Sequence, residues 1–382
     1  MPDTTIHLAL TDDWELRGNG SGDVAQIQFR PMRELRRIYE SCGVRSTFNV
    51  EVMQQLTFRK LQDKHCELKA LADAWDDHVR EAFRHGQDIQ LHVHPQWSEA
   101  RYERGSWILS GDWALPNYDQ DRAYQMLAES KKYLEEILRP LDPAYKCVAF
   151  RAGASVIAPS KFALHVLSSL GIVFDMSIVG GLRVNTRNLQ IDYWDCEESF
   201  LPFYPRMEDA RRVSYKKEPI ICVPIFHFTL SRRQAFKQTL SKALRVAGRK
   251  SARGAKGSGD KTDYTNEEWA EVGRSSTLAR VYDKAIRPSL VGKYMVADIS
   301  QLDYAGLLEM IAAIRARARA TELSRVPVIL TNHSKYIRDF YGIERFITEI
   351  SKAEDIKFVT LTELAENLQA GEYPIRRANG GR

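Results

Sequence analysis

The sequence predicts an α/β fold in which strands alternate with helices. Short apolar segments alternate with longer segments of helical spacing, a pattern typical of parallel strand–helix units. Ionisable residues follow five of the predicted strands, as they do on the active-site face of a β/α barrel. Of the 382 residues, 44% are hydrophobic and 27% are charged. This composition indicates a folded globular protein and excludes disordered and collagen-like chains.

The first half of the chain supplies three predicted strands, over 6–11, 47–50 and 88–94. A glycine-rich loop over 17–23 follows the first strand. A helix is expected over 31–41, because Met32, Leu35 and Ile38 recur at helical spacing and Gly43 can end the helix. A long helical region over 52–85 precedes the third strand.

The second half continues the alternation. Helices are expected over 119–138, 159–170, 339–353 and 361–368, and strands over 147–150, 172–174, 219–224, 326–330 and 357–360. Gly171 follows the second of these helices, and Pro219 opens the third of these strands. We find no internal repeat.

A basic segment over 228–300 interrupts the alternation. Ten basic residues and one acidic residue lie between Ser231 and Thr262, although the whole chain carries only +5. We expect one barrel formed by 1–227 and 301–370, a basic helical and flexible insertion over 228–300, and a tail over 371–382. Such a run is most often a solvated face. It can also act as a lid, or contact a phosphorylated substrate or a membrane surface. Nucleic acid is a less favoured partner, because no nucleic-acid-binding fold surrounds the run.

Nothing in the sequence indicates a membrane span or a secretory signal. No apolar run approaches the roughly 20 residues of a transmembrane helix, and the first residues lack a basic start followed by an apolar stretch. We therefore expect a cytoplasmic protein. The five cysteines have no paired spacing, so we assign them no metal or catalytic role.

Two histidines in the third strand are candidate metal ligands. His92 and His94 are two residues apart, so both side chains point to one face with Cα atoms roughly 6.5–7 Å apart. A carboxylate from a neighbouring strand could complete the site. Asp12 and Asp13 follow the first strand, and their side chains diverge, so one can bind a metal while the other faces the water. The alternative is a polar barrel face that binds nothing.

Three further ionisable residues follow strands. His333 could protonate a leaving amine near neutral pH, although a lone histidine is more often structural. Arg151 could pair with Asp12 and hold it ionised. Asp175 could be an ordinary residue at a strand end.

These motifs together resemble the polysaccharide deacetylase superfamily, the NodB-homology domains of carbohydrate esterase family four. Thr11-Asp12-Asp13-Trp14 is similar to the family's TFDDG motif, and Gly86 to His92 is similar to its histidine motif. Segments 45–50, 150–153, 170–175, 218–224, 330–333 and 346–368 resemble the later motifs in the same order. The resemblance spans residues 5 to 368 outside the insertion.

The resemblance implies a deformed β/α barrel of about seven strands and a divalent metal, often zinc. Asp13 and His92 would bind the metal. Asp12 would be the base that deprotonates a metal-bound water, and Arg151 would orient Asp12. His333 would be the acid, and Asp175 would tune it.

The sequence departs from the family pattern at two positions. The family's second metal histidine corresponds to Gln96, so we expect His94 to replace it. Trp14 replaces the glycine of TFDDG and could stack on a sugar. Trp97 and Tyr204 are further candidate sugar platforms, together with Trp107 and Trp113, although each alone is more often a packing residue.

The prediction is thus a metal-dependent deacetylase of an N-acetylated sugar or glycan precursor. Two alternatives stay open. One is a catalytically silent barrel that binds a glycan or regulates a partner. The other is a different hydrolase of carbon–nitrogen or glycosidic bonds on the same fold.

Overall fold

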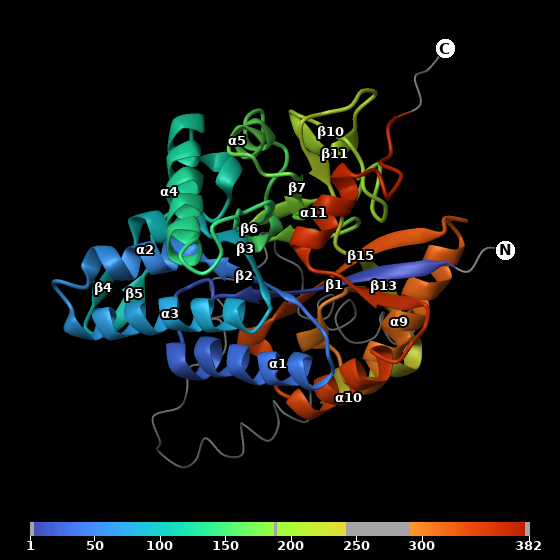
Figure 1. Ribbon diagram of the computed structural model, residues 1–382, viewed down its shortest axis with the longest axis horizontal. Helices are drawn as coiled ribbons and strands as arrows, with labels where there is room; N and C mark the ends of the chain where they lie inside the picture. Colours follow the sequence, from blue (N-terminus) through green and yellow to red (C-terminus); the bar gives the residue numbers. More distant parts are fainter. Residues whose placement is uncertain (1–3, 187–188, 242–290, 379–382) are drawn as a thin grey trace, which may run out of the picture.

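A curved parallel sheet lies at the centre of the structure, a computed structural model that describes residues 4–186, 189–241 and 291–378. Seven strands are hydrogen-bonded in the order β12-β7-β6-β3-β2-β1-β15, and β16 pairs with the first half of β1 (Figure 1). The strands are β1 (Thr5–Trp14), β2 (Thr47–Glu51), β3 (Asp88–Val93), β6 (Ala149–Ala152), β7 (Phe174–Asp175), β12 (Ile221–Cys222), β15 (Arg325–His333) and β16 (Ile356–Phe358). Every pairing in this sheet is parallel.

The segment after β12 brings the two edges of the sheet together. Ile225 forms a parallel bridge with Ile329 of β15, and the backbone N–H of Phe226 donates to the carbonyl of Ile329 at 3.0 Å. The sheet therefore curves into a deformed barrel. The predicted deformed α/β barrel is confirmed.

Helices surround the sheet (Figure 1). They are α1 (Arg30–Ser41), α2 (Val52–Leu61), α3 (Cys66–Arg84), α4 (Gln120–Leu138), α5 (Ala163–Ser169), α9 (Tyr304–Arg319), α10 (Phe340–Ile350) and α11 (Leu361–Gln369). The helical region predicted over 52–85 is two helices. The Glu51 side chain caps the start of α2 by accepting from the backbone N–H of Gln54. None of the described helices has both the length and the hydrophobicity to cross a membrane.

Within the described residues, four two-stranded antiparallel sheets lie beside the barrel. They are β4 (Arg101–Glu103) with β5 (Ser106–Ile108), β8 (Arg183–Asn185) with β9 (Gln190–Asp192), β10 (Pro205–Arg206) with β11 (Asp209–Val213), and β13 (His227–Leu230) with β14 (Lys293–Val296). The pair β13–β14 lies at the two ends of the expected insertion, and residues 232–241 are helical. The low-complexity stretch over 248–259 lies outside the described residues.

Side chains of successive strand residues enter two different cores. Leu8, Leu10 and Trp14 of β1 belong to the outer core between the sheet and the helices. Ala9 belongs to the inner core inside the barrel, with Ala149, Phe174, Ile221, Ile329 and apolar residues of α11. Alternation along each strand therefore decides whether a polar side chain points into the barrel or toward the helices.

Two strands that carry candidate residues are longer than predicted. Strands β1 and β15 pair in register from Thr5 with Arg325 to Asp13 with His333, and β2 pairs with β1 as far as Trp14. The aspartates and His333 are thus strand residues. Their directions are set by the pleat of the sheet.

Candidate metal centre and catalytic groups

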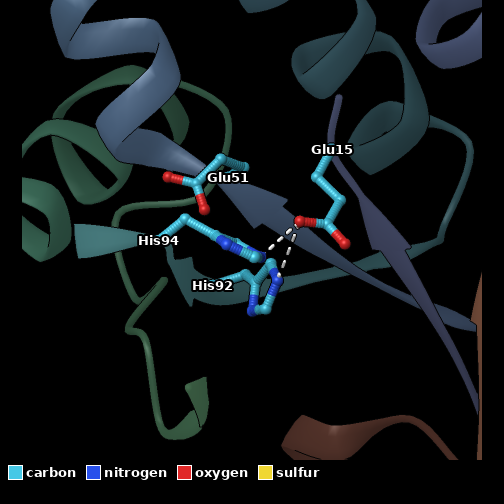
Figure 2. Close-up of side chains that lie close together, drawn as sticks. All are labelled: Glu15, Glu51, His92 and His94. Carbon is cyan, nitrogen blue, oxygen red and sulfur yellow. Dashed lines mark ion pairs between the residues drawn. The ribbon is translucent and has the colours of Figure 1, made fainter. Parts of the chain in front are cut away.

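Four buried side chains meet at the carboxyl ends of the strands: Glu15, Glu51, His92 and His94 (Figure 2). One possible ligand atom from each lies within 4.8 Å of those of the others. Glu15 Oε2 forms an ion pair with His94 and lies 3.5 Å from Nε2 of His92. Two imidazoles and two carboxylates are a donor set that suits zinc and other divalent transition metals.

The arrangement of atoms in this cluster fits a bound cation. Oε2 of Glu51 is buried without a hydrogen-bond partner, and Nε2 of His92 and Nε2 of His94 both face Glu15 Oε2. Nδ1 of His92 lies 2.9 Å from the carbonyl oxygen of Arg151, to which it can donate its proton. In the neutral imidazole, that bond leaves the lone pair of Nε2 facing the cluster, as a hydrogen bond to the other ring nitrogen does for metal-binding histidines.

Gln96, where the family pattern has its second histidine, supports His94. Its Nε2 lies 2.9 Å from Nδ1 of His94 and 3.4 Å from the carbonyl oxygen of Gly18. Metal binding through Nε2 of His94 requires a proton on Nδ1. The Oε1 atom of Gln96 is buried without a partner, and rotation of the amide by 180° would let it accept that proton.

Asp13 occupies a different position from the one expected for a metal ligand. Its Oδ1 accepts from Nη1 of Arg151 at 2.6 Å and from the Asn49 amide at 3.1 Å. Its Oδ2 lies 3.6 Å from Nε2 of His333. The carboxylate that Arg151 contacts is therefore Asp13, which corrects the expected pair of Arg151 with Asp12. The guanidinium of Arg151 also donates to the hydroxyls of Thr11 and Thr331.

Asp12 points the other way, into the outer core. It accepts from the hydroxyl of Tyr39 at 3.1 Å and from the amide of Asn332. Burial outweighs these two bonds and raises the pKa of Asp12 to about 7. The reason for this direction is parity, since Asp12 shares the row of Leu8, Leu10 and Trp14.

His333 is held by an acidic residue that the sequence did not single out. Its Nδ1 lies 2.8 Å from Oδ2 of Asp298, and its side chain is 31% exposed. Burial opposes the charged form, but Asp298 and Asp13 outweigh it and raise the pKa of His333. Asp175, the residue expected to tune His333, instead accepts from the hydroxyl and backbone of Ser177, and burial raises its pKa to about 6. Asp175 alternates with Phe174 of the inner core, so it points out of the barrel.

The charges in the centre favour two ionised carboxylates. Burial opposes ionisation of Glu15, yet His94 and Lys335 hold its pKa well below the usual range. Burial likewise opposes ionisation of Asp13, yet Arg151 and His92 lower its pKa. The same carboxylates overcome the burial of His92 and raise its pKa to about 9, whereas burial raises the pKa of Glu51.

The three aromatic residues expected to bind sugar pack inside the protein. The indole N–H of Trp14 donates to the carbonyl of Gln28 at 2.7 Å, and its ring packs against Phe29 and Trp75. Trp97 packs edge-on against Phe58 and Trp107. Tyr204 is buried in the inner core. All three residues are buried, so none of these rings offers an open face to a sugar.

Sequence reasoning missed Glu15, Glu51, Asp298 and Lys335. A signal existed for two of them. Glu15 is two residues beyond Asp13 and shares its face, and Glu51 directly follows the apolar strand residue Val50. Lys335 contacts Glu15 Oε1 at 2.6 Å from a short helical turn after β15. That contact and the one between Asp298 and His333 depend on tertiary structure.

The fold is similar to that of a solved structure described as a putative polysaccharide deacetylase. A putative polysaccharide deacetylase from Mycobacterium smegmatis aligns over 100% of this chain and 96% of its own, with 14% identity and a TM-score of 0.50. A probable polysaccharide deacetylase from Pseudomonas aeruginosa aligns over 97% and 92%, with 10% identity and a TM-score of 0.45. Puue allantoinase aligns over 97% and 92%, with 10% identity and a TM-score of 0.47.

Comparisons of the sequence with known families and proteins identify no relative of this chain. No family model matches the chain, and the search of curated proteins finds no match. The resemblance to the polysaccharide deacetylase superfamily is thus confirmed at the level of the fold.

Proposed function

We propose that the protein is a metal-dependent hydrolase that removes an N-acetyl group from a sugar or glycan precursor. The observation that carries this proposal is the position of the Glu15–Glu51–His92–His94 cluster beside two charged pairs. Asp13 is paired with Arg151, and His333 is paired with Asp298. Metal ligands, an ionised carboxylate and a protonated imidazole are the groups that amide hydrolysis needs.

Glu15, Glu51, His92 and His94 would hold the metal. A divalent metal bound there, zinc or another transition metal, would polarise the amide carbonyl and lower the pKa of a water molecule. His92 is already oriented by the carbonyl of Arg151.

Asp13 is the proposed base, in place of Asp12. Arg151 and Asn49 both donate to Oδ1 of Asp13, which leaves Oδ2 to accept a proton from the attacking water. The lowered pKa of Asp13 keeps it ionised and ready to accept. Asp12 faces Tyr39 on the opposite side of the strand, so it cannot reach a substrate in the barrel mouth.

His333 is the proposed acid. Asp298 accepts a hydrogen bond from the N–H at Nδ1 of His333. The proton on Nε2 can then pass to the leaving nitrogen when the carbon–nitrogen bond breaks. The raised pKa of His333 keeps it protonated near neutral pH. Its partly exposed side chain indicates that the substrate enters on this side.

The test is metal content and acetate release of the same purified protein. We expect one divalent metal per chain by mass spectrometry, and acetate from at least one member of a panel of N-acetylated sugars and sugar precursors. His92→Ala should lose the metal and the activity. His165→Ala, a change at an exposed histidine of α5, should keep both.

The other outcomes separate the alternatives. A protein that stays empty after zinc is supplied would contradict the proposal and favour a silent binding barrel. A loaded protein that releases no acetate but cleaves a cyclic amide or a glycosidic bond would point to a different hydrolase on this fold.

A further inference from the structure

Arg17 is a buried cation without a counter-charge. It lies two residues beyond Glu15, and the residue is 5% exposed. Its Nε is buried without a hydrogen-bond partner. Over the part of the chain that the structure describes, its guanidinium makes no hydrogen bond, ion pair or cation–π contact. Its Nη atoms are not among the fully covered unpartnered atoms, so they keep some contact with solvent.

This environment is unusual for arginine. Burying a charge without a partner is costly, and buried arginines are normally paired. Arg151 shows the usual solution, since it is 1% exposed but contacts Asp13 and two hydroxyls. The nearest acidic residue before Arg17 in the chain and the nearest one after it are both engaged elsewhere. Glu15 pairs with His94 and Lys335, and Asp23 accepts from the backbone of Gln26.

The neighbours of Arg17 connect it to the metal centre. The carbonyl of Leu16 lies 3.3 Å from Nζ of Lys335, which contacts Glu15. The carbonyl of Gly18 lies 3.4 Å from Nε2 of Gln96, which contacts His94. Arg17 therefore begins a loop that borders the centre on both sides.

The loop over 17–22 folds back on the guanidinium. The backbone N–H of Gly20 donates to the carbonyl of Arg17 at 2.7 Å, and Gly20 has φ +75°, where a Cβ would lie 2.6 Å from Cβ of Trp107. A Cβ on Gly22 would lie 3.0 Å from Nη1 of Arg17, so the return of the loop touches the cation. Oγ of Ser21, within this loop, is a second buried atom without a partner.

We propose that the loop over 17–22 binds a phosphoryl group of the substrate, with Arg17 as the main contact and Ser21 as a second donor. A guanidinium binds phosphate oxygens through two parallel bonds. A phosphoryl group has a further oxygen for the hydroxyl of Ser21, whereas both oxygens of a carboxylate would be used by the guanidinium. The inference rests on the proposed function in one respect only. It specifies the sugar substrate as a phosphorylated N-acetyl sugar.

The first experiment measures phosphate binding to the full-length protein after metal removal, so that neither a metal nor turnover contributes. Titration calorimetry with inorganic phosphate should show one site in the wild type. Arg17→Gln should weaken it by at least about tenfold, the loss expected for a charge-assisted pair. Ser21→Ala should weaken it by a smaller factor. Arg30→Gln, which removes an exposed arginine of α1, should bind as the wild type does.

Thermal unfolding separates a binding role from a structural one. Without phosphate, Arg17→Gln should unfold at or above the wild-type temperature, because it removes an unpaired buried charge. A large fall would mean that Arg17 stabilises the fold, and would overturn the proposal. Arg17→Lys keeps the charge without the fork, so it should bind phosphate more weakly than the wild type does.

Two further results would overturn the inference, and both leave the proposed hydrolase intact. One is the absence of phosphate binding to the wild type. The other is binding of acetate but not phosphate. With the zinc-loaded enzyme, N-acetylglucosamine 1-phosphate should have a lower KM than N-acetylglucosamine, and Arg17→Gln should abolish that difference.

Discussion

Glu15→Gln should empty the metal centre, whereas Asp13→Asn should leave it loaded. Both changes are nearly isosteric, and both remove one buried carboxylate that is paired with a buried cation. The two carboxylates differ in position. Glu15 contacts the two histidines of the cluster, whereas Asp13 lies between Arg151 and His333. The pair of variants therefore distinguishes the ligand set that we propose from the structure from the set that the sequence predicts.

The stability cost of each change can be estimated from the ion pairs. Lys335 is 4% exposed, and its Nζ lies 2.6 Å from Glu15 Oε1. At an effective dielectric constant of about 20, that distance corresponds to roughly 6 kcal/mol of attraction. Much of this attraction is offset by the cost of burying the charges. For Glu15→Gln we therefore expect the free energy of unfolding to fall by about 3–5 kcal/mol, the usual cost of removing one partner of a buried pair. Asp13→Asn breaks the equally short contact with Arg151, so the free energy of unfolding should fall by a similar amount.

The assay combines urea unfolding of the metal-free variants with metal content after dialysis against zinc. Glu15→Gln should hold less than stoichiometric zinc, and Asp13→Asn should hold about one per chain without turnover. The double variant Glu15→Gln with Lys335→Met should recover much of the lost stability but none of the zinc. Full zinc occupancy in Glu15→Gln together with an empty Asp13→Asn would refute the reasoning and restore Asp13 as a ligand.

Three other predictions follow from the charges. Asp12→Asn should keep turnover. The pKa of Asp12 is about 7 in the folded protein and near 4 in the unfolded chain. The free energy of unfolding of the wild type should therefore fall by on the order of 4 kcal/mol as the pH rises from 4 to 7. Urea unfolding at pH 5 and pH 8 should show this fall in the wild type but not in the variant. Asp298→Asn should lower the pKa of His333 and move the alkaline limb of kcat to lower pH; an unmoved limb would exclude His333 as the acid. Because the pKa of His92 is about 9 in the metal-free protein, zinc affinity measured by chelator competition should rise by about tenfold per pH unit from pH 7 to 9, and a flat profile would count against His92 as a ligand.

Local sequence patterns were sufficient for the order of the elements. Apolar runs and helical spacing predicted the main strands and helices, because side-chain alternation is a local property of the chain. They also identified His92, Arg151 and His333 as polar residues at the carboxyl ends of strands. In a parallel barrel such ends meet on one face, so a shared site could be predicted before any contact was known.

The sequence did not predict where the strands end, and the directions of the site residues depend on those ends. The apolar run of β1 ends before Asp12, and the strand continues because β15 pairs with it as far as Asp13 and β2 pairs with it as far as Trp14. That extension places Asp13 and Glu15 on the inner row and Asp12 on the outer row. The sequence indicated that the two aspartates diverge, but not which of them enters the barrel.

The sequence by itself thus determined the fold class and the chemistry available at the strand ends, since both depend on residue type and spacing. Only the tertiary structure decided the partners. Asp13 meets Arg151 across 138 positions, and His333 meets Asp298 beside β14. Glu15 and Glu51 join two histidines from a third strand. Such contacts depend on the register and curvature of neighbouring strands, which non-local pairing sets.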